Sequence, residues 1–322
     1  MTPPIPVAAP RRASHTVISA RLVLESAGVF AGLLLAAGWT FHQLEGPLRW
    51  PVLLVLAAAQ GLWLDRLYVT SHEAIHRKLF PGRARLNDWT GAVLMLPLMA
   101  PFTVYRRVHA FHHGVNRRDP ESAALDHFRA KASCSPLHRA WYRAVWLFYV
   151  FGGGFYLHSV ATVALFLLAP NPWAERISPV FANRPPALRA RAGLEFATGA
   201  ALHAAVMMIW GVQAWIALLG LPLLVFAWVW SLLLYIYHYR ADVGPDVRRN
   251  VRSLPRQPFF SWLLLNFNEH ATHHHDPRLP WYALPQHRVP SPPEPSGEPV
   301  RSLWQAIWRQ RRGPVFWTPD GA

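Results

Sequence analysis

The sequence predicts an all-α integral membrane protein with about four transmembrane helices, additional re-entrant or interfacial helices, and a cytoplasmic cap rich in clustered histidines. Three observations predict this class. The 322 residues are 52% hydrophobic, and the apolar residues form long runs. Arginines gather in the loops beside those runs, as the positive-inside rule describes for cytoplasmic loops. Histidines form three clusters at the ends of apolar segments.

Charge and cysteine content restrict the function classes. A formal net charge of +15 would suggest nucleic acid binding in a soluble protein. Beside apolar runs, the headgroups of anionic membrane lipids are the expected counter-charge, so we expect no nucleic acid partner. The single cysteine, Cys134, excludes a disulfide within the chain, a cysteine zinc site and a cysteine-held iron–sulfur cluster. No flavin or nicotinamide fingerprint is present, so redox chemistry would need a separate electron donor.

The chain divides into three parts. Residues 1–20 contain several prolines and no long apolar core, which predicts a disordered cytoplasmic arm. Residues 21–285 form the predicted membrane domain, and residues 286–322 a Pro-rich linker with an amphipathic tail that either rests on the membrane or frays. The membrane domain opens with two expected spans, from about Val23 to Phe41 and over about 51–70, each near the roughly 20 residues that a span needs.

The path of the later apolar segments through the membrane is constrained, because the histidine clusters must share one side of it. Residues 89–105 should dip in and return, or lie in the interface, because a single crossing would separate the first two clusters. Residues 141–169 have arginines on both flanks and should be re-entrant or in-plane. Residues 195–237 suit a hairpin of two spans that turns near Gly211. With four spans, both termini and all clusters lie on one side, which we expect to be the cytoplasmic side. The expected membrane is a bacterial inner membrane.

The histidine clusters have spacings that place several imidazoles on one helical face. Positions i, i+3 and i+4 of a helix face the same way. Imidazole is the commonest metal ligand in proteins and suits iron, zinc and copper. The clusters are His72-Glu-Ala-Ile-His76, His109-Ala-Phe-His112-His113 and His270-Ala-Thr-His273-His274. His275 extends the last cluster, but it should point about 100° away from the shared face.

Together these clusters resemble the signature of the membrane fatty acid desaturase and hydroxylase superfamily, which is H-x(3–4)-H, H-x-x-H-H and H/Q-x-x-H-H. That family's H-H-x-x-P-x-x-P-x-x-x-L-P tail is matched at Pro277, Pro280, Leu284 and Pro285. The resemblance extends from about His72 to Pro285 and so covers most of the chain.

The resemblance implies a function. It implies two iron ions bound by the eight clustered histidines, dioxygen as co-substrate, and oxidation of a C–H bond in a lipid or acyl chain. Electrons would come from a ferredoxin or similar donor with its reductase. The proline tail favours a fatty acid desaturase, while a carotenoid or other lipid hydroxylase or ketolase remains the alternative.

The resemblance also implies a ninth ligand, His238, because related desaturases carry a lone histidine at the end of the span before the third box. Here the flanking residues are Tyr237 and Tyr239, which differ from the family's pattern. The other interpretation is an interfacial residue within an aromatic belt.

Two function classes from outside this family remain open. His-Glu-x-x-His is also the zincin motif, in which Glu73 would be the general base of a membrane metalloprotease. That interpretation leaves the other clusters unexplained. A non-enzymatic metal-binding or transport protein would need ionisable residues at mid-bilayer depth. Only His203 and His158 lie inside apolar segments, where we expect hydrogen-bonded packing residues. Asp65, two turns before the first cluster, either orients an imidazole or forms an interfacial turn with Arg66.

Overall fold

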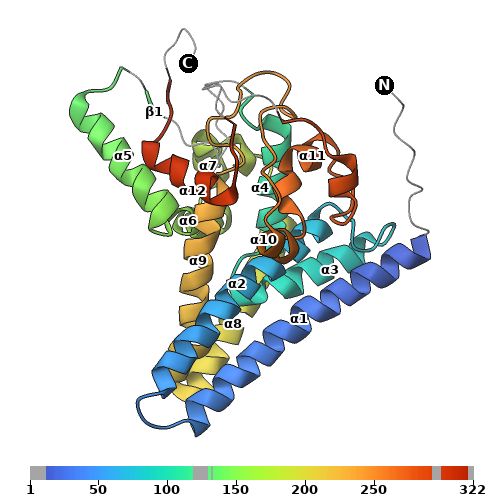
Figure 1. Cartoon of the computed structure of the whole chain (residues 1–322), viewed down its shortest axis with the longest axis vertical. Helices are drawn as coiled ribbons and strands as arrows, with labels where there is room; N and C mark the ends of the chain where they lie inside the picture. Colours follow the sequence, from blue (N-terminus) through green and yellow to red (C-terminus); the bar gives the residue numbers. More distant parts are fainter. Residues whose placement is uncertain (1–11, 119–129, 132, 292–298, 318–322) are drawn as a thin grey trace.

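The computed structural model describes residues 12–118, 130–131, 133–291 and 299–317. Over these residues the protein is helical, and its one strand pairing is the two-residue parallel bridge between β1 (Ala130–Lys131) and β2 (Phe316–Trp317). In the described ranges, three helical stretches are long and apolar enough to cross a membrane, or four if a sharply bent pair counts as one. In Figure 1, α1, α2 and α8 form the lower part of the molecule, while α4, α10, α11 and α12 gather in the upper part. The all-α membrane class is therefore confirmed.

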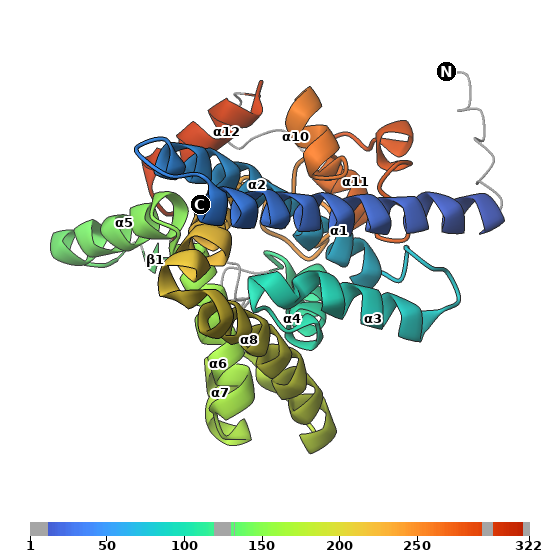
Figure 2. The same cartoon turned by 90° about the horizontal axis from the view of Figure 1, so that it is seen from below.

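The first two helices form a long antiparallel hairpin, α1 (Arg12–Gln43) and α2 (Arg49–Ile75). Gly46, at φ 77°, lies in the turn between them. Polar side chains join the helices inside the apolar interface, where Trp63 donates from Nε1 to the carbonyl oxygen of Ser26 at 2.8 Å. Seen from below, α1 runs across the molecule with α3 (Ala84–Met95) and α10 (Pro258–Leu263) on opposite sides (Figure 2).

The prediction of a disordered arm over residues 1–20 is wrong for residues 12–20, which are the first turns of α1. His15 is buried, and its ring hydrogen-bonds to the hydroxyl of Tyr282 and to the carbonyl oxygen of Lys78. These contacts tie the start of α1 to the cap, which the polar sequence alone does not reveal. Residues 1–11 lie outside the described part of the chain.

The segment predicted to dip and return is broken into short pieces. Helix α3 is followed by the 3-10 turn η1 (Leu96–Leu98) and by α4 (Phe102–Val115). At about 1.5 Å per residue, the 12 residues of α3 extend about 18 Å, which is short of the roughly 30 Å hydrocarbon core. Met99 adopts a left-handed conformation at φ 50° between η1 and α4 and redirects the chain.

The two later apolar segments are also interrupted at glycines. Helices α5 (Pro136–Phe151) and α6 (Gly154–Leu168) meet at 91°, with Gly153 at φ 80° between them. Short pieces α7 (Asn171–Ile177) and η2 (Pro179–Phe181) lead into α8. Helix α8 (Pro186–Trp215) continues through a π-helical turn, η3 (Ile216–Gly220), into α9 (Leu221–Leu234). Gly211, at φ 85° and ψ 166°, breaks this stretch where the sequence predicts the hairpin turn.

The chain after α9 builds the cap. It contains α10, the 3-10 turn η4 (Phe267–Glu269), α11 (His270–His275), the turn η5 (Leu284–His287), α12 (Leu303–Arg309) and the turn η6 (Gln310–Arg312). Over its described residues the predicted amphipathic tail is helical at α12 and does not fray there. Leu303, Ala306 and Ile307 are buried in the main core, and Trp146 donates from Nε1 to the carbonyl oxygen of Gln310 at 2.6 Å. The protein therefore covers part of the apolar surface of α12, whereas Trp304 and Trp308 stay 60% and 58% exposed.

Candidate metal centre

Four separate elements bring the predicted histidines together. His72 lies in the last turn of α2 and His76 directly after it. The second box lies on α4, and the third box forms most of α11. His238 lies in the turn after α9, where its amide donates to the carbonyl oxygen of Tyr235 at 3.0 Å. All nine predicted histidines meet in two groups.

The first group contains five imidazoles, His72, His76, His109, His113 and His273. Their ligand nitrogens lie within 4.8 Å of one another. Nε2 of His109 is 2.9 Å from Nε2 of His72 and 2.8 Å from Nε2 of His76. It is also 3.0 Å from Nε2 of His113. One imidazole nitrogen holds either one proton or one lone pair, so it can form only one hydrogen bond of this kind. Three such contacts at one atom are the arrangement expected where lone pairs converge on a site that could hold a cation.

The second group contains four imidazoles, His112, His238, His270 and His274. Nε2 of His112 lies 3.1 Å from Nε2 of His274, and Nε2 of His238 lies 3.2 Å from Nε2 of His270. Spacings near 3 Å are those of neighbouring nitrogens around one metal at about 2.1 Å. Both groups therefore fit a metal ion.

Burial favours the neutral, metal-binding form of several of these imidazoles. Removal from solvent is the largest cause that lowers the pKa of His109, and nearby histidines lower it further. The same cause lowers the pKa of His270, His273 and His274. A neutral imidazole has a free lone pair on one ring nitrogen, whereas an imidazolium has none. Neither group includes a carboxylate or a thiolate, and an all-imidazole donor set suits iron, zinc or copper better than magnesium or calcium.

Side chains behind the ligands hold α4 against the loop that follows His238. Asn116 ends α4, and its amide donates to the carbonyl oxygen of Asn250 at 3.0 Å. The amide of Asn250 returns a hydrogen bond to the carbonyl oxygen of Asn116 at 3.1 Å. Arg117 donates from Nη2 to the carbonyl oxygen of Ala241 at 2.7 Å. These contacts fix the second box relative to His238, although the two are far apart in sequence.

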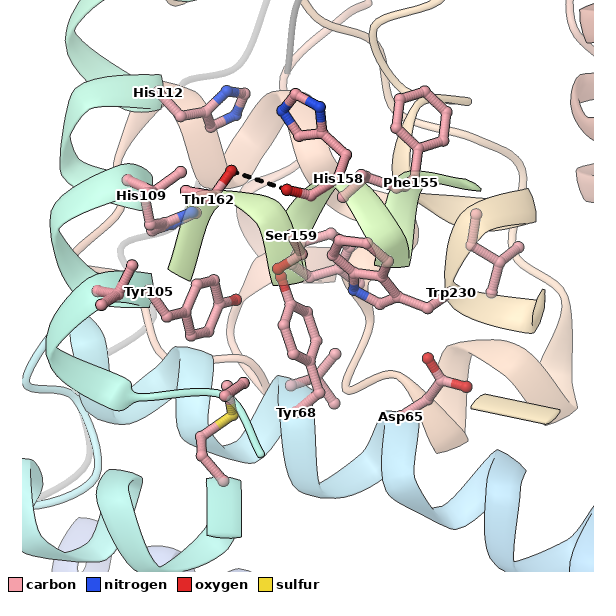
Figure 3. A pocket seen from close by; sticks show the side chains of 18 of the residues that line it. Asp65, Tyr68, Tyr105, His109, His112, Phe155, His158, Ser159, Thr162 and Trp230 are labelled. Carbon is pink, nitrogen blue, oxygen red and sulfur yellow. Dashed lines mark hydrogen bonds between the residues drawn. The ribbon is translucent and has the colours of Figure 1, made fainter. Parts of the chain in front are cut away.

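An apolar cavity of about 180 Å³ reaches the clustered histidines. His109, His112, His238 and His270 line it together with apolar and aromatic side chains of α2, α4, α6 and α9. In Figure 3, His109 and His112 lie on one strip of α4 at one end of the cavity, and Asp65 lies at the other. The clustered histidines therefore border an apolar space.

Comparison with known proteins identifies the family. Residues 47–304 match the sequence model described as "Fatty acid desaturase", and this match covers well over half of the chain. The chain belongs to the fatty acid desaturase family. The clustered histidines of this family member could hold metal ions.

A curated desaturase is similar over a shorter stretch. A segment of 69 residues is 35% identical to the sn-1 oleoyl-lipid 12-desaturase of Arthrospira platensis. The match covers 21% of this family member and 19% of that protein, so it spans about a fifth of the relative's length.

The surroundings of Glu73 argue against the metalloprotease interpretation. Its carboxylate forms a buried ion pair with the Lys78 ammonium at 2.7 Å and accepts from the amide of Trp281 at 3.1 Å. Lys78 donates in turn to the carbonyl oxygen of Leu279 at 2.9 Å. A carboxylate paired with an ammonium is a poor general base. In this family member Glu73 instead joins the first box to the proline tail.

Two further histidines behave as packing residues. His203 hydrogen-bonds from Nε2 to the carbonyl oxygen of Pro97 at 3.0 Å, and Trp215 donates to its Nδ1 at 3.2 Å. His158 lines the cavity on α6 and lies 3.5 Å from the hydroxyl of Tyr149. Neither belongs to a metal group among the described residues. His275 is exposed and also lies outside both groups, as its position on α11 predicts.

Both sequence-based interpretations of Asp65 are wrong. Asp65 and Arg66 are buried inside α2, so they form no interfacial turn. Arg66 pairs with Glu25 at 3.2 Å. No hydrogen bond between Asp65 and an imidazole occurs among the described residues, and its side chain lines the cavity.

Sequence reasoning missed the cavity residues Tyr68 and Tyr105, whose rings stack with centroids 4.7 Å apart. Each tyrosine precedes a box histidine by four residues and so shares its helical face. That spacing is the signal that could have found them.

Proposed function

We propose that this protein desaturates a fatty acyl chain at a di-iron centre, with dioxygen as co-substrate. One observation carries the proposal: two groups of convergent imidazole nitrogens lie at the end of an apolar cavity. The five-histidine group would hold one iron and the four-histidine group, with His238, the other. Iron bound there would supply the dioxygen activation that removes hydrogen from an unactivated C–H bond.

The protein's own contribution is to position the chain and exclude water. Val104, Leu233 and Phe267 are among the side chains that line the cavity beside the histidines. An alkyl chain held there brings a carbon near the metal groups and displaces water from them, which protects a reactive centre. Ring contacts between Tyr68, Tyr105 and Trp230 stiffen the wall and limit where the chain can bend.

Electrons must reach the centre from another protein. Desaturation removes two hydrogens from the chain and reduces dioxygen to two waters, which requires two further electrons and two protons. With one cysteine, the chain cannot bind an iron–sulfur cluster through cysteines. We therefore propose a ferredoxin or similar donor with its reductase as partner.

The experiment is expression of the protein with a ferredoxin and its reductase in an oxygenated host, followed by mass spectrometry of the lipids. Loss of two hydrogens from an acyl chain supports desaturation. Gain of one oxygen indicates the hydroxylase alternative, and gain of one oxygen with loss of two hydrogens indicates the ketolase. His270→Ala should abolish product, whereas His275→Ala, a matched change on the same helix outside both groups, should retain it.

We further propose that the termini and both metal groups face the cytoplasm of a bacterial inner membrane. The arginine-rich loops support this orientation. Cysteines introduced at Val115 and Phe260 in a Cys134→Ser background should be labelled from the same side by an impermeant reagent. Labelling from opposite sides would contradict a shared site.

A further inference from the structure

Asp65 is a buried carboxyl group with no role in the proposed metal chemistry. It is 2% exposed and lies within α2, ten residues before the last residue, Ile75. At about 1.5 Å per residue this is about 15 Å from the end of the helix. Its side chain lines the cavity, and Figure 3 shows the carboxyl oxygens directed into it, below Trp230.

Within the described part of the chain, this carboxyl group has no charged partner. Among the described residues no ion pair includes Asp65, and its Oδ2 atom has no hydrogen-bond partner. The neighbouring guanidinium of Arg66 points elsewhere, to Glu25 and to the carbonyl oxygens of Trp262 and Leu263. Burying a carboxyl group in an apolar cavity without a partner is strongly unfavourable, which makes it a candidate for ligand binding.

The cavity supplies the place for the missing partner. It extends from Asp65, past the stacked rings of Tyr68 and Tyr105, to His109 and His112. Asp65 precedes His72 by seven residues on α2, which is about 10 Å along the helix axis. One elongated ligand can therefore contact Asp65 and place a carbon beside the histidines.

We propose that Asp65 binds a hydrogen-bond-donating group, a hydroxyl or an amine, on the lipid chain and so selects the carbon that is oxidised about 10 Å away. This inference rests on the proposed function and names its substrate class. A carboxyl oxygen accepts a hydrogen bond from either group, and the bond would give the Asp65 carboxyl group a partner that the described residues do not supply. A plain alkyl chain would leave it unpaired, so the site should discriminate against such a chain.

The test measures binding and needs no turnover. Purified, metal-loaded protein in lipid nanodiscs is titrated with dodecanol, dodecylamine, dodecane and dodecanoic acid, and binding is followed by tryptophan fluorescence. We expect the alcohol or the amine to bind at least about tenfold more tightly than the alkane. In Asp65→Leu this preference should disappear while metal content stays unchanged. In Asp65→Asn a preference for the alcohol should survive, whereas a preference for the amine should be lost.

The outcomes separate this inference from the proposed function. Preference for the alcohol alone identifies a hydroxyl, and preference for the amine alone identifies an ammonium partner. Equal binding of alcohol, amine and alkane, tightest binding of the acid, or an unchanged preference in Asp65→Leu would overturn the role of Asp65. Asp65→Leu removes a buried uncompensated group and should fold at least as well as the unmodified protein. Failure to form any oxidised lipid would instead contradict the proposed function and leave the binding result valid.

Discussion

Replacement of His238 by alanine tests the two-group metal centre most directly. His238 is 3% exposed, and its Nε2 atom lies 3.2 Å from that of His270 in the four-histidine group. The substitution leaves that group with three imidazoles, while the five-histidine group shares no member with it and stays complete. Bound iron should therefore fall from about two ions to about one ion per chain, and desaturation should be abolished.

The assay is elemental analysis of purified protein after loading with iron, combined with lipid mass spectrometry of the expressing cells. His270→Ala, in the same group, should lose the same share of iron. His203→Ala is the matched control, because His203 is equally buried in a membrane helix but bonds only to Pro97 and Trp215 among the described residues. Full iron content and near-normal activity in His238→Ala would show that His238 is an interfacial residue of the aromatic belt. That result would refute a metal site in the four-histidine group.

Three other results are expected. Glu73→Gln leaves the buried Lys78 ammonium without its counter-charge, so the free energy of unfolding should fall by about 3–5 kcal/mol in thermal unfolding. Adding Lys78→Met to this variant should recover most of the lost stability. No loss in the single variant would contradict the structural role of the pair. His274→Ala should abolish activity while His275→Ala keeps most of it, because only His274 lies in a metal group; equal losses would show that the helix register is wrong. Purified protein supplied with substrate, iron and dioxygen should not turn over repeatedly, and sustained turnover with NAD(P)H alone would refute the need for a separate donor.

The sequence by itself determined the class, the family and the nine histidines. Apolar runs of membrane length can be satisfied only by helices, because lipid offers the backbone no hydrogen-bond partner. Spacings of three and four residues place imidazoles on one face wherever a helix forms. These are local properties, so a single chain reveals them without tertiary information.

Tertiary structure decided which histidines share a group. The second box is divided, with His109 and His113 facing the first box and His112 facing His238. That division depends on how α4 crosses α2 and approaches α11, which no local spacing specifies. The same holds for the helical start of α1, whose His15 is held by the cap, and for the buried face of α12.

Asp65 shows most clearly what the sequence alone does not determine. Its distance from His72 along the helix was readable from sequence, but the direction of its side chain relative to α6 and α9 was not. Whether a buried carboxyl group finds a partner depends on neighbours from distant parts of the chain, and here those neighbours form an apolar cavity. Only the packing of the helices made Asp65 a candidate substrate contact.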